Sequence, residues 1–209
     1  MKTILHPSYF GSIAEYAVIA QSEKVIFENF DNYQKQTYRN RCYIYGANGK
    51  LNLNIPIKHT KTDGKKLTKD IKIDNSFHWN KQHVKSLQIA YRTSPFFEYY
   101  EDDLLAILEK EHEFLMDLNL ETNAFVQDAL QIEIPTEKSS EFFLSYEDSD
   151  IIDFRNLVNA KKTPNFKFDS YVQVFDDKHG FIPNLSILDL LFMEGPNSIS
   201  FLEKMNITK

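Results

Sequence analysis

The sequence predicts an α+β fold in a single domain, with a mixed or antiparallel sheet that includes a hairpin near residues 37–57 and a helical section over about residues 79–131. Three observations carry this prediction. Runs typical of strands and of helices follow one another without the regular βαβ alternation of a doubly wound sheet. The chain has 209 residues, enough for one well-filled core. It contains no internal repeat and no Pro- or Ser-rich linker, so residues 1–209 are expected to form one domain.

The first strands and the first helix are indicated by short apolar patterns. Thr3–Leu5 is typical of a short strand, and Val25–Phe30 of a second one. Between them, after Pro7, apolar residues recur at spacings of three and four over residues 9–20, which favours a helix.

The clearest strand signal is a hairpin. Residues Thr37–Tyr45 lead into the turn Gly46–Lys50, and Leu51–Ile55 then alternates apolar and polar residues. The Asn-Gly pair in the turn readily adopts the positive φ angles of a tight reversal. Pro56 cannot donate to a strand ladder, so it is expected at an edge or a strand end.

The helical section begins at Trp79. A helix over Trp79–Arg92 stops before Pro95, a second runs from Phe96 through Leu118, and a third covers Glu121–Leu130. Near the end of the chain, a helix over Ile187–Phe192 is preceded by Ser186 as its cap and is stopped by Gly195-Pro196. Further strands are expected at three short runs: Ile71–Asp74, Phe142–Tyr146 and Tyr171–Phe175.

Composition excludes several classes of protein. Hydrophobic residues make up 42% of the chain and aromatic residues 14%, with 6 Gly and 7 Pro, which is not the composition of a disordered or collagen-like protein. No apolar run approaches the roughly 18 residues of a membrane-spanning helix, and the first residues are too polar for a secretory leader. Cys42 is the single cysteine, which favours a reducing compartment. We therefore expect a cytoplasmic protein without a membrane span.

Charge is distributed unevenly along the chain. Residues 35–92 hold 13 Lys and Arg against three acids, a net charge of +10, while the whole chain has a net charge of -6. The total argues against general affinity for nucleic acid without excluding it, and the local excess can attract an anionic small molecule such as a phosphate or a nucleotide sugar. The alternative is that the lysines of residues 58–69 belong to a solvated loop.

One face of the predicted strand Thr37–Tyr45 is a candidate binding surface. A period of two places Arg39, Arg41, Tyr43 and Tyr45 on the same face. Two guanidinium groups can hold a phosphate or carboxylate through forked hydrogen bonds, and the tyrosines can stack on a base or sugar. Alternatively, this face is solvent-exposed and its arginines cover aromatic neighbours. Cys42 lies on the opposite face and is expected to be an inert core residue.

The Trp-bearing helix supplies a second group of candidates. His83 lies on the same flank as Trp79, while Lys81 and Lys85 occupy the other side. An imidazole near basic residues can act as a general base or bind phosphate. The alternative is a histidine that is hydrogen-bonded within the core.

The remaining histidines point to no metal centre. His6 follows the first predicted strand, where sheet folds often place ligands, while His112 lies among acidic residues and is expected on a solvated helix face. No histidine pair has metal-ligand spacing with a third donor, and no nucleotide-binding glycine motif or serine-hydrolase motif is present. The sequence thus predicts no metal and leaves any cofactor unknown.

Four stretches of the chain resemble the WbqC-like family of bacterial proteins, along nearly the whole length. They are His6–Phe10; Asn40–Ile44 with Ile55–Ile57; Trp79–Lys85 with Ile89–Tyr91 and Pro95–Phe97; and Asn184–Phe192 before Glu194–Pro196. His6 stands where many relatives carry Gln, and Met193 where many carry Asn. The resemblance implies a cytoplasmic bacterial protein whose relatives include some encoded among polysaccharide and O-antigen biosynthesis functions.

The resemblance also implies candidate residues, without supplying a mechanism. The matched polar and aromatic candidates are Asn40, Arg41, Trp79, Lys81, His83, Tyr91 and Asp189. For Asp189 an alternative is that it completes the helix cap with Ser186.

Our leading hypothesis is a transferase acting on a phosphorylated or nucleotide-linked sugar. In it, His83 and Asp189 are catalytic, and the ligand is bound by His6, Arg39, Asn40, Arg41, Tyr43, Trp79, Lys81, Lys85 and Tyr91. The hairpin and the Trp-bearing helix would enclose one positively polarised cavity. The alternative is a non-catalytic binding or scaffold protein that uses the same basic aromatic face to hold a nucleotide, RNA or an acidic partner.

Overall fold

The computed structural model describes residues 1–58, 66–147 and 149–207, and within them the fold is α+β, as the sequence predicts. The strands are β1 (Lys2–Leu5), β2 (Lys24–Phe27), β3 (Arg41–Gly46), β4 (Gly49–Asn54), β5 (Thr136–Lys138) and β6 (Ile151–Asp153). The helices are α1 (Ile13–Ala20), α2 (Trp79–Tyr91), α3 (Phe97–Glu109), α4 (Leu115–Ala129), α5 (Asp176–His179), α6 (Ile187–Glu194) and α7 (Ser198–Lys204).

The main sheet has four strands in the order β5-β2-β1-β6, and all three pairings are parallel. Parallel strands need long crossover connections, which here run through α1 between β1 and β2 and through the rest of the molecule for the two outer strands. The carboxyl ends of all four strands therefore lie at one edge of the sheet. We call it the carboxyl edge.

The hairpin is the antiparallel part of the fold. β3 pairs with β4 from Arg41↔Asn54 to Gly46↔Gly49, and Gly49 adopts the positive φ of +94° that the turn requires. The predicted start of this strand at Thr37 is wrong, because residues 38–40 form a turn and the strand begins at Arg41. Pro56 lies beyond the end of β4, as expected.

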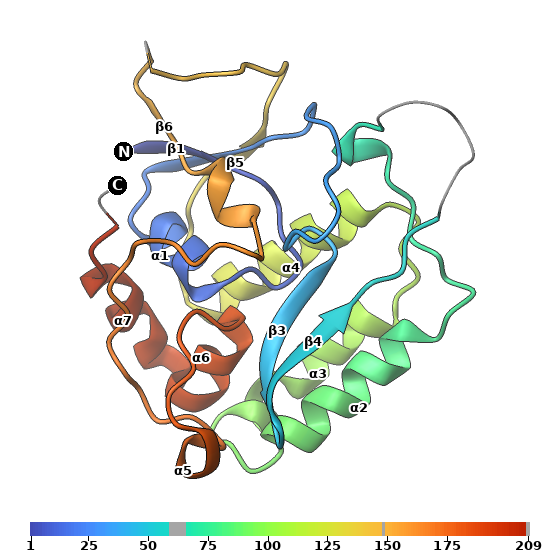
Figure 1. Ribbon diagram of the computed structural model, residues 1–209, viewed down its shortest axis with the longest axis vertical. Helices are drawn as coiled ribbons and strands as arrows, with labels where there is room; N and C mark the ends of the chain where they lie inside the picture. The colour runs from blue at the N-terminus through green and yellow to red at the C-terminus, as the bar shows by residue number, and fades with distance from the viewer. Residues whose placement is uncertain (59–65, 148, 208–209) are drawn as a thin grey trace.

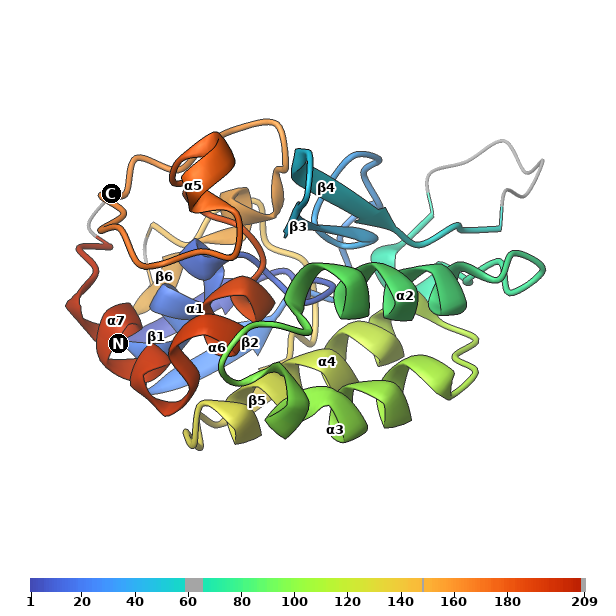
Figure 2. The ribbon, with the colours of Figure 1, turned by 90° about the horizontal axis from the view of Figure 1, so that it is seen from below.

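The hairpin lies near the middle of the molecule, with α2 and α3 on one side of it and α1, α6 and α7 on the other (Figure 1). Seen from below, it covers α2, and α3 and α4 form the layer farther from it (Figure 2). Apolar side chains from Leu5 to Ile207 pack into one continuous core. This core agrees with a single domain, while the extension of one family domain over residues 1–209 stays a prediction.

The helical section differs from the prediction at one break. The second helix ends at Glu109, and a new helix begins at Leu115. Between them the chain is held by distant backbone, since Ile73 N donates to Glu113 O at 2.9 Å and Leu115 N donates to Ile71 O at 2.9 Å. These pairings replace helical hydrogen bonds that the local apolar spacing had suggested.

His112 lies at this break, and its predicted position on a solvated helix face is wrong. The imidazole is buried, with Nε2 2.7 Å from Glu121 Oε2 and Nδ1 3.1 Å from the carbonyl oxygen of Lys110. The histidine therefore joins the end of α3 to α4.

Three predicted strands are absent from the described structure. Residues 71–74 form only isolated bridges, and residues 142–146 and 171–175 are irregular. The sheet instead takes β5 and β6, which are three residues long and have no alternating pattern. β5 pairs with β2, and β6 pairs with β1. Because these partners are distant in the sequence, the residues of β5 and β6 do not by themselves indicate a strand.

We expect Gly195→Ala to lower the free energy of unfolding by about 2–4 kcal/mol, because φ is +53° and a Cβ would lie 2.6 Å from the ring of Phe96. Gly49→Ala is the matched control, since Gly49 also has positive φ but a Cβ there meets nothing within 4 Å. Urea unfolding of both variants measures the difference. Equal losses for the two variants would show that the contact with Phe96 is unimportant.

Candidate functional site

A cavity of about 640 Å³ opens at the carboxyl edge of the parallel sheet. It is lined by His6, residues 31–34, Arg39, Phe142 and several residues of the segment 153–162. In open α/β sheets, ligands bind outside the carboxyl ends of the strands, because loops from several strands converge there. We call this hollow the carboxyl-edge cavity.

Its centre is a buried cluster around Asp31. The guanidinium of Arg39 donates through Nη2 to Asp31 Oδ2, and Thr68 Oγ1 donates to Asp31 Oδ1 at 2.6 Å. The imidazole Nε2 of His6 lies 3.6 Å from Asp31 Oδ2. Four segments distant in the sequence meet here: the end of β1, the loop after β2, the turn before β3 and the start of a short 3-10 helix.

Arg39 is almost completely buried, with 1% of its surface exposed. Besides Asp31, it donates through Nη1 to Thr37 Oγ1 at 3.3 Å, and its Nε has no hydrogen-bond partner. Burial lowers the pKa of Arg39 and Asp31 opposes this, so the guanidinium remains a cation, as arginine does in proteins. The Arg39 guanidinium is thus held by Asp31 and Thr37, while its Nε–H has no acceptor within the described part of the protein.

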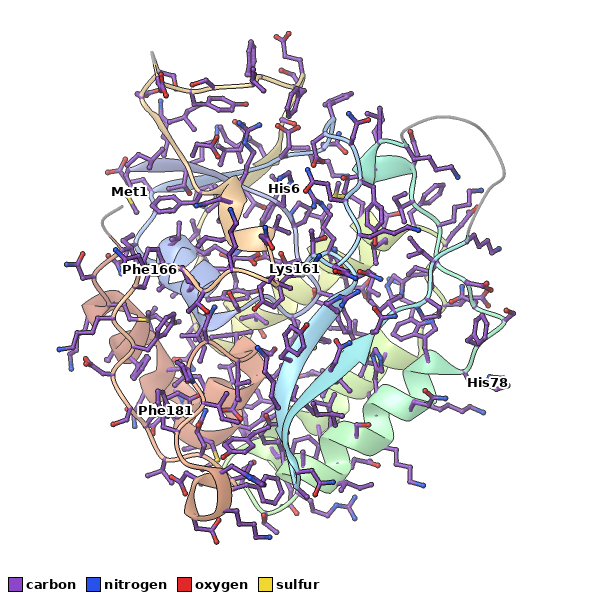
Figure 3. The ribbon with its side chains drawn as sticks, viewed as in Figure 1. Met1, His6, His78, Lys161, Phe166 and Phe181 are labelled. Atoms are coloured by element: carbon purple, nitrogen blue, oxygen red, sulfur yellow. The ribbon has the colours of Figure 1, made fainter. Side chains whose placement is uncertain are left out.

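His6 is neutral near pH 7. Burial, together with the positive charges of Arg39 and Arg155, holds the pKa of His6 well below its usual value of 6.5. Its Nδ1 is buried without a hydrogen-bond partner. In Figure 3, His6 lies toward the interior of the molecule, whereas His78 lies at its edge. A neutral imidazole beside a carboxylate can accept a proton, and the carboxylate stabilises the imidazolium that results.

Asp31 is the carboxyl group beside this histidine, with no hydrogen bond between them at 3.6 Å. Burial raises the pKa of Asp31 above its usual value of 3.8, while Arg39 and the hydroxyl of Thr68 oppose that rise. With two donors holding it, the carboxyl group is fixed in place beside His6. This arrangement resembles the base and orienting group of many proton-transfer sites.

Arg155 forms a wall of the cavity. Its guanidinium donates to both carboxylate oxygens of Asp153, to Glu28 Oε2 at 3.2 Å and to the carbonyl oxygens of Phe143 and Leu144. These bonds occupy its donors, so Arg155 fastens the segment 142–146 over the sheet edge and leaves ligand binding to other groups.

Glu28 shapes the loop that carries Asp31. Directly after β2, its Oε1 accepts hydrogen bonds from the backbone N of Asn29 and Phe30 and from Ser139 Oγ, each at 2.9 Å. Its other carboxylate oxygen accepts from Arg155. The Glu28 carboxylate thus fixes the turn after β2 and links the carboxyl ends of β2, β5 and β6.

The predicted site residues do not share one cavity. His6 and Arg39 line the carboxyl-edge cavity, Asn40 and Arg41 line a second hollow, and Lys81 and Lys85 line a third. Where a cavity between the hairpin and α2 was expected, β3 packs directly on α2, and Tyr45 N donates to Tyr91 Oη at 3.0 Å. Tyr43 lies under Lys50, whose Nζ is 4.1 Å from the ring centre.

His83 and Trp79 belong to the core. His83 Nδ1 lies 2.9 Å from Tyr9 Oη, and the Trp79 ring packs against the imidazole at 5.2 Å between centres. Burial lowers the pKa of His83 to about 4. This environment matches the alternative of a histidine hydrogen-bonded within the core, and a catalytic role for His83 stays a prediction without a cavity to support it.

Asp189 is the acceptor of a buried network. Its carboxylate accepts from Tyr91 Oη at 2.6 Å, from Tyr171 Oη and from Gln173 Nε2 at 2.8 Å, and it is fully buried. Ser186 caps α6 through Leu188 N without help from Asp189, so the capping-box alternative is wrong. The network ties α2 and the segment 171–173 to α6.

Sequence reasoning missed several residues of the carboxyl-edge cavity, namely Asp31, Tyr33, Arg155 and Lys162, and Thr68, which donates to Asp31. Asp31 directly follows the predicted strand Val25–Phe30, so the rule that selected His6 could have found it. Arg155 and Lys162 follow β6, which had no recognisable pattern, and Thr68 comes from a segment that only the fold brings near.

A model of the WbqC-like protein family matches residues 6–167. The chain belongs to this family. The match begins at His6 and includes every residue that lines the carboxyl-edge cavity, whereas Asp189 and the stretch Asn184–Pro196 lie outside it. No curated protein and no solved structure is significantly similar to the chain.

The described residues contain neither a cluster of metal-ligating side chains nor a helix that could span a membrane. Over residues 1–58, 66–147 and 149–207, no three His, Cys, Asp or Glu side chains gather as ligands of one metal ion. In the same part of the chain, no helix has the length and apolarity needed to cross a membrane.

Another buried carboxyl group, that of Glu15, lies within the electrostatic influence of Arg39 at the carboxyl-edge cavity. Glu15 of α1 is buried against Gly11, where a Cβ would come within 2.7 Å of the carboxylate, and its Oε2 has no hydrogen-bond partner. Burial raises the pKa of Glu15 to about 8, and Ser8 and Arg39 oppose the rise. The folded protein therefore keeps a proton on Glu15 at neutral pH.

We expect stability to fall as pH rises from about 7 to 8, because unfolding releases the proton that folded Glu15 retains. For one such group the free energy of unfolding falls by up to about 1.4 kcal/mol per pH unit. This pH dependence ends once the pH exceeds the pKa of Glu15 in the folded protein. His6 and His83 have lowered pKa values and contribute slope only at lower pH. Glu15→Gln keeps the shape and removes the titration, so its unfolding free energy should be flatter over this range. An unchanged slope in the variant would contradict the prediction.

Proposed function

We propose that the protein is a transferase acting on a phosphorylated or nucleotide-linked sugar, and that the carboxyl-edge cavity is its site. One observation carries the proposal: His6, Asp31 and Arg39 converge there, and both His6 Nδ1 and Arg39 Nε are buried without partners. Buried polar atoms normally have hydrogen-bond partners, so unpaired ones at a cavity indicate a ligand. A volume of about 640 Å³ is within the usual range for small-molecule sites.

The lining suits a sugar that carries an anionic group. Amide side chains of Asn32, Asn156 and Asn159 offer both donors and acceptors to hydroxyl groups, and the rings of Tyr33 and Phe142 offer apolar surface. Arg39 at the base and Lys162 at the rim supply positive charge for a phosphate.

In this proposal His6 replaces His83 as the acid/base group. His6 takes the proton from a hydroxyl or amine of the sugar as that group bonds to the transferred group, whose bond to the rest of the donor breaks so that the leaving group departs with the electron pair. Asp31 stabilises the imidazolium. Arg39 holds the anionic part of the substrate, as the sequence analysis proposed. Arg41, Asn40 and the lysines of α2 lie outside this cavity, so they hold no part of the sugar in it.

The resemblance to the WbqC-like family supports a setting for the proposed reaction. Relatives linked to polysaccharide and O-antigen biosynthesis make a sugar the favoured substrate, and we place the reaction in the bacterial cytoplasm, where nucleotide sugars are made. The identity of the transferred group is left open by the chemistry of the cavity.

We expect Lys162→Ala to weaken the binding of hexose 1-phosphates or nucleotide-linked hexoses about three- to tenfold, because it removes one exposed cation from the cavity rim. Lys161→Ala is the matched control: both lysines are exposed neighbours, and only Lys162 lines the cavity. Titration calorimetry with a panel of these compounds measures the difference. The proposal is wrong if none binds at millimolar concentration, or if the two variants bind alike. RNA binding in a gel shift without turnover would instead support a binding protein.

Comparing two histidine variants decides which one carries proton transfer. We expect His6→Gln to lower kcat about 10²- to 10⁴-fold while the affinity for substrate changes little, since the amide keeps hydrogen bonds but cannot accept the proton. His83→Gln should mainly lower the melting temperature, because it disturbs the contact with Tyr9. Turnover assays and thermal unfolding of both proteins check this. Normal turnover in His6→Gln with loss in folded His83→Gln would restore the sequence-based assignment.

A further inference from the structure

A second hollow of about 610 Å³ lies beside the carboxyl-edge cavity, and Tyr33 lines both. Its lining includes Lys35, Asn40, Arg41 and Phe77, together with the end of β4. We call it the Arg41 hollow. Because the two hollows share a wall residue, one elongated ligand can occupy both.

Arg41 has no hydrogen-bond or ion-pair partner among the residues that the structure describes. Its Nε is buried without a hydrogen bond, and no ion pair or hydrogen bond joins its guanidinium to another described residue. The two other arginines nearby are different, since Arg39 is paired with Asp31 and Arg155 with Asp153 and Glu28. A partly buried guanidinium with unused donors is preorganised to bind a phosphate or carboxylate from outside the chain.

Asn40 provides a second unpaired atom at the same hollow. Its Nδ2 donates to Ile55 O at 2.9 Å and to Asn54 Oδ1 at 3.3 Å, which fixes the amide plane. Its Oδ1 is buried and has no partner. The hollow therefore presents a fixed acceptor next to a cation, and a ligand that satisfies both carries an anionic group and an N–H or O–H donor.

An aromatic ring and a second cation complete the lining. Phe77 is 60% exposed, which is unusual for a side chain of its size, and Lys35 is also exposed. Stacking of a base on an aromatic ring stabilises binding by about 1–3 kcal/mol. Asp74 is the one acid among the lining residues, and it accepts hydrogen bonds from the backbone N and the hydroxyl of Ser76.

We propose that the Arg41 hollow binds the nucleoside diphosphate part of a nucleotide-linked sugar, while the sugar itself enters the carboxyl-edge cavity past Tyr33. Arg41 and Lys35 hold the phosphates, Phe77 stacks on the base, and Asn40 Oδ1 accepts from a donor of the nucleoside. A simple sugar phosphate would leave the ring and the amide unused, so the geometry favours the nucleotide. This inference rests on the proposed function and narrows its substrate to the nucleotide-linked class.

We expect Arg41→Gln to weaken the tightest-binding nucleoside diphosphate at least tenfold in titration calorimetry with UDP, GDP, CDP, ADP and dTDP. Arg92→Gln is the matched control, because Arg92 is an exposed arginine at the end of α2 that lines none of the described hollows. Phe77→Leu should weaken the same nucleotide about threefold or more and leave inorganic pyrophosphate unaffected. Lys35→Ala, at an exposed site, provides a second test if Arg41→Gln folds poorly.

The outcomes separate this inference from the proposed function. If Arg41→Gln and Lys35→Ala both bind every nucleotide as the parent does, or if pyrophosphate binds as tightly as the best nucleotide, the inference is overturned. If, in addition, Lys162→Ala still weakens the binding of hexose 1-phosphates, only the nucleotide inference is overturned and the proposed function stands. If Arg41→Gln weakens nucleotide binding but Lys162→Ala binds both hexose 1-phosphates and nucleotide-linked hexoses as Lys161→Ala does, the nucleotide site is supported and the sugar transferase is overturned.

Discussion

The buried ion pair between Arg39 and Asp31 is the interaction on which the carboxyl edge depends. Two charges taken out of water are costly, and only close pairing with further hydrogen bonds offsets that cost. Here Thr68 and Thr37 supply the further hydrogen bonds, one to each partner. Removing one partner of such a pair typically costs about 3–5 kcal/mol, because the other charge is left buried. The pair therefore holds the loop after β2 against the turn before β3.

The same pair gives the cavity its chemical character. Burial, together with the positive charges of Arg39 and Arg155, lowers the pKa of His6 and keeps that imidazole neutral, and in our proposal Asp31 stabilises its protonated form. Asn119 supports the arrangement from below, donating through Nδ2 to the carbonyl oxygens of Pro7 and Arg39. The structural ion pair and the proposed proton-transfer site share these residues, so substitutions of Arg39 or Asp31 would affect folding as well as any activity.

Two arginines that are two residues apart have different roles. Arg39 precedes β3 in a turn and is buried with a carboxylate, whereas Arg41 begins β3 and faces a hollow without a partner. A regular strand would have placed both on one face, as the sequence analysis assumed. The turn at residues 38–40 separates them into two adjacent hollows, for which we propose a sugar and a nucleotide as ligands.

Local signals found some elements and missed others for identifiable reasons. The hairpin and α2 were predicted because alternation, the Asn-Gly turn and apolar spacing act within a few residues. β5 and β6 were missed because a three-residue parallel strand is stabilised by partners more than a hundred residues away. His6 was selected through its place after a strand, whereas the contact of His83 with Tyr9 joins residues 74 apart in the sequence and has no local signal. The catalytic roles of both histidines stay proposals.

The amino-acid sequence by itself determined the α+β class, the hairpin, the main helices and the family, because each depends on short-range patterns or on the identity of residues along the chain. The tertiary structure alone decided which polar groups are buried, which are paired and which share a cavity. Burial and pairing of these groups depend on the order of strands that are distant in the sequence, because the carboxyl edge forms only when the four parallel strands assemble.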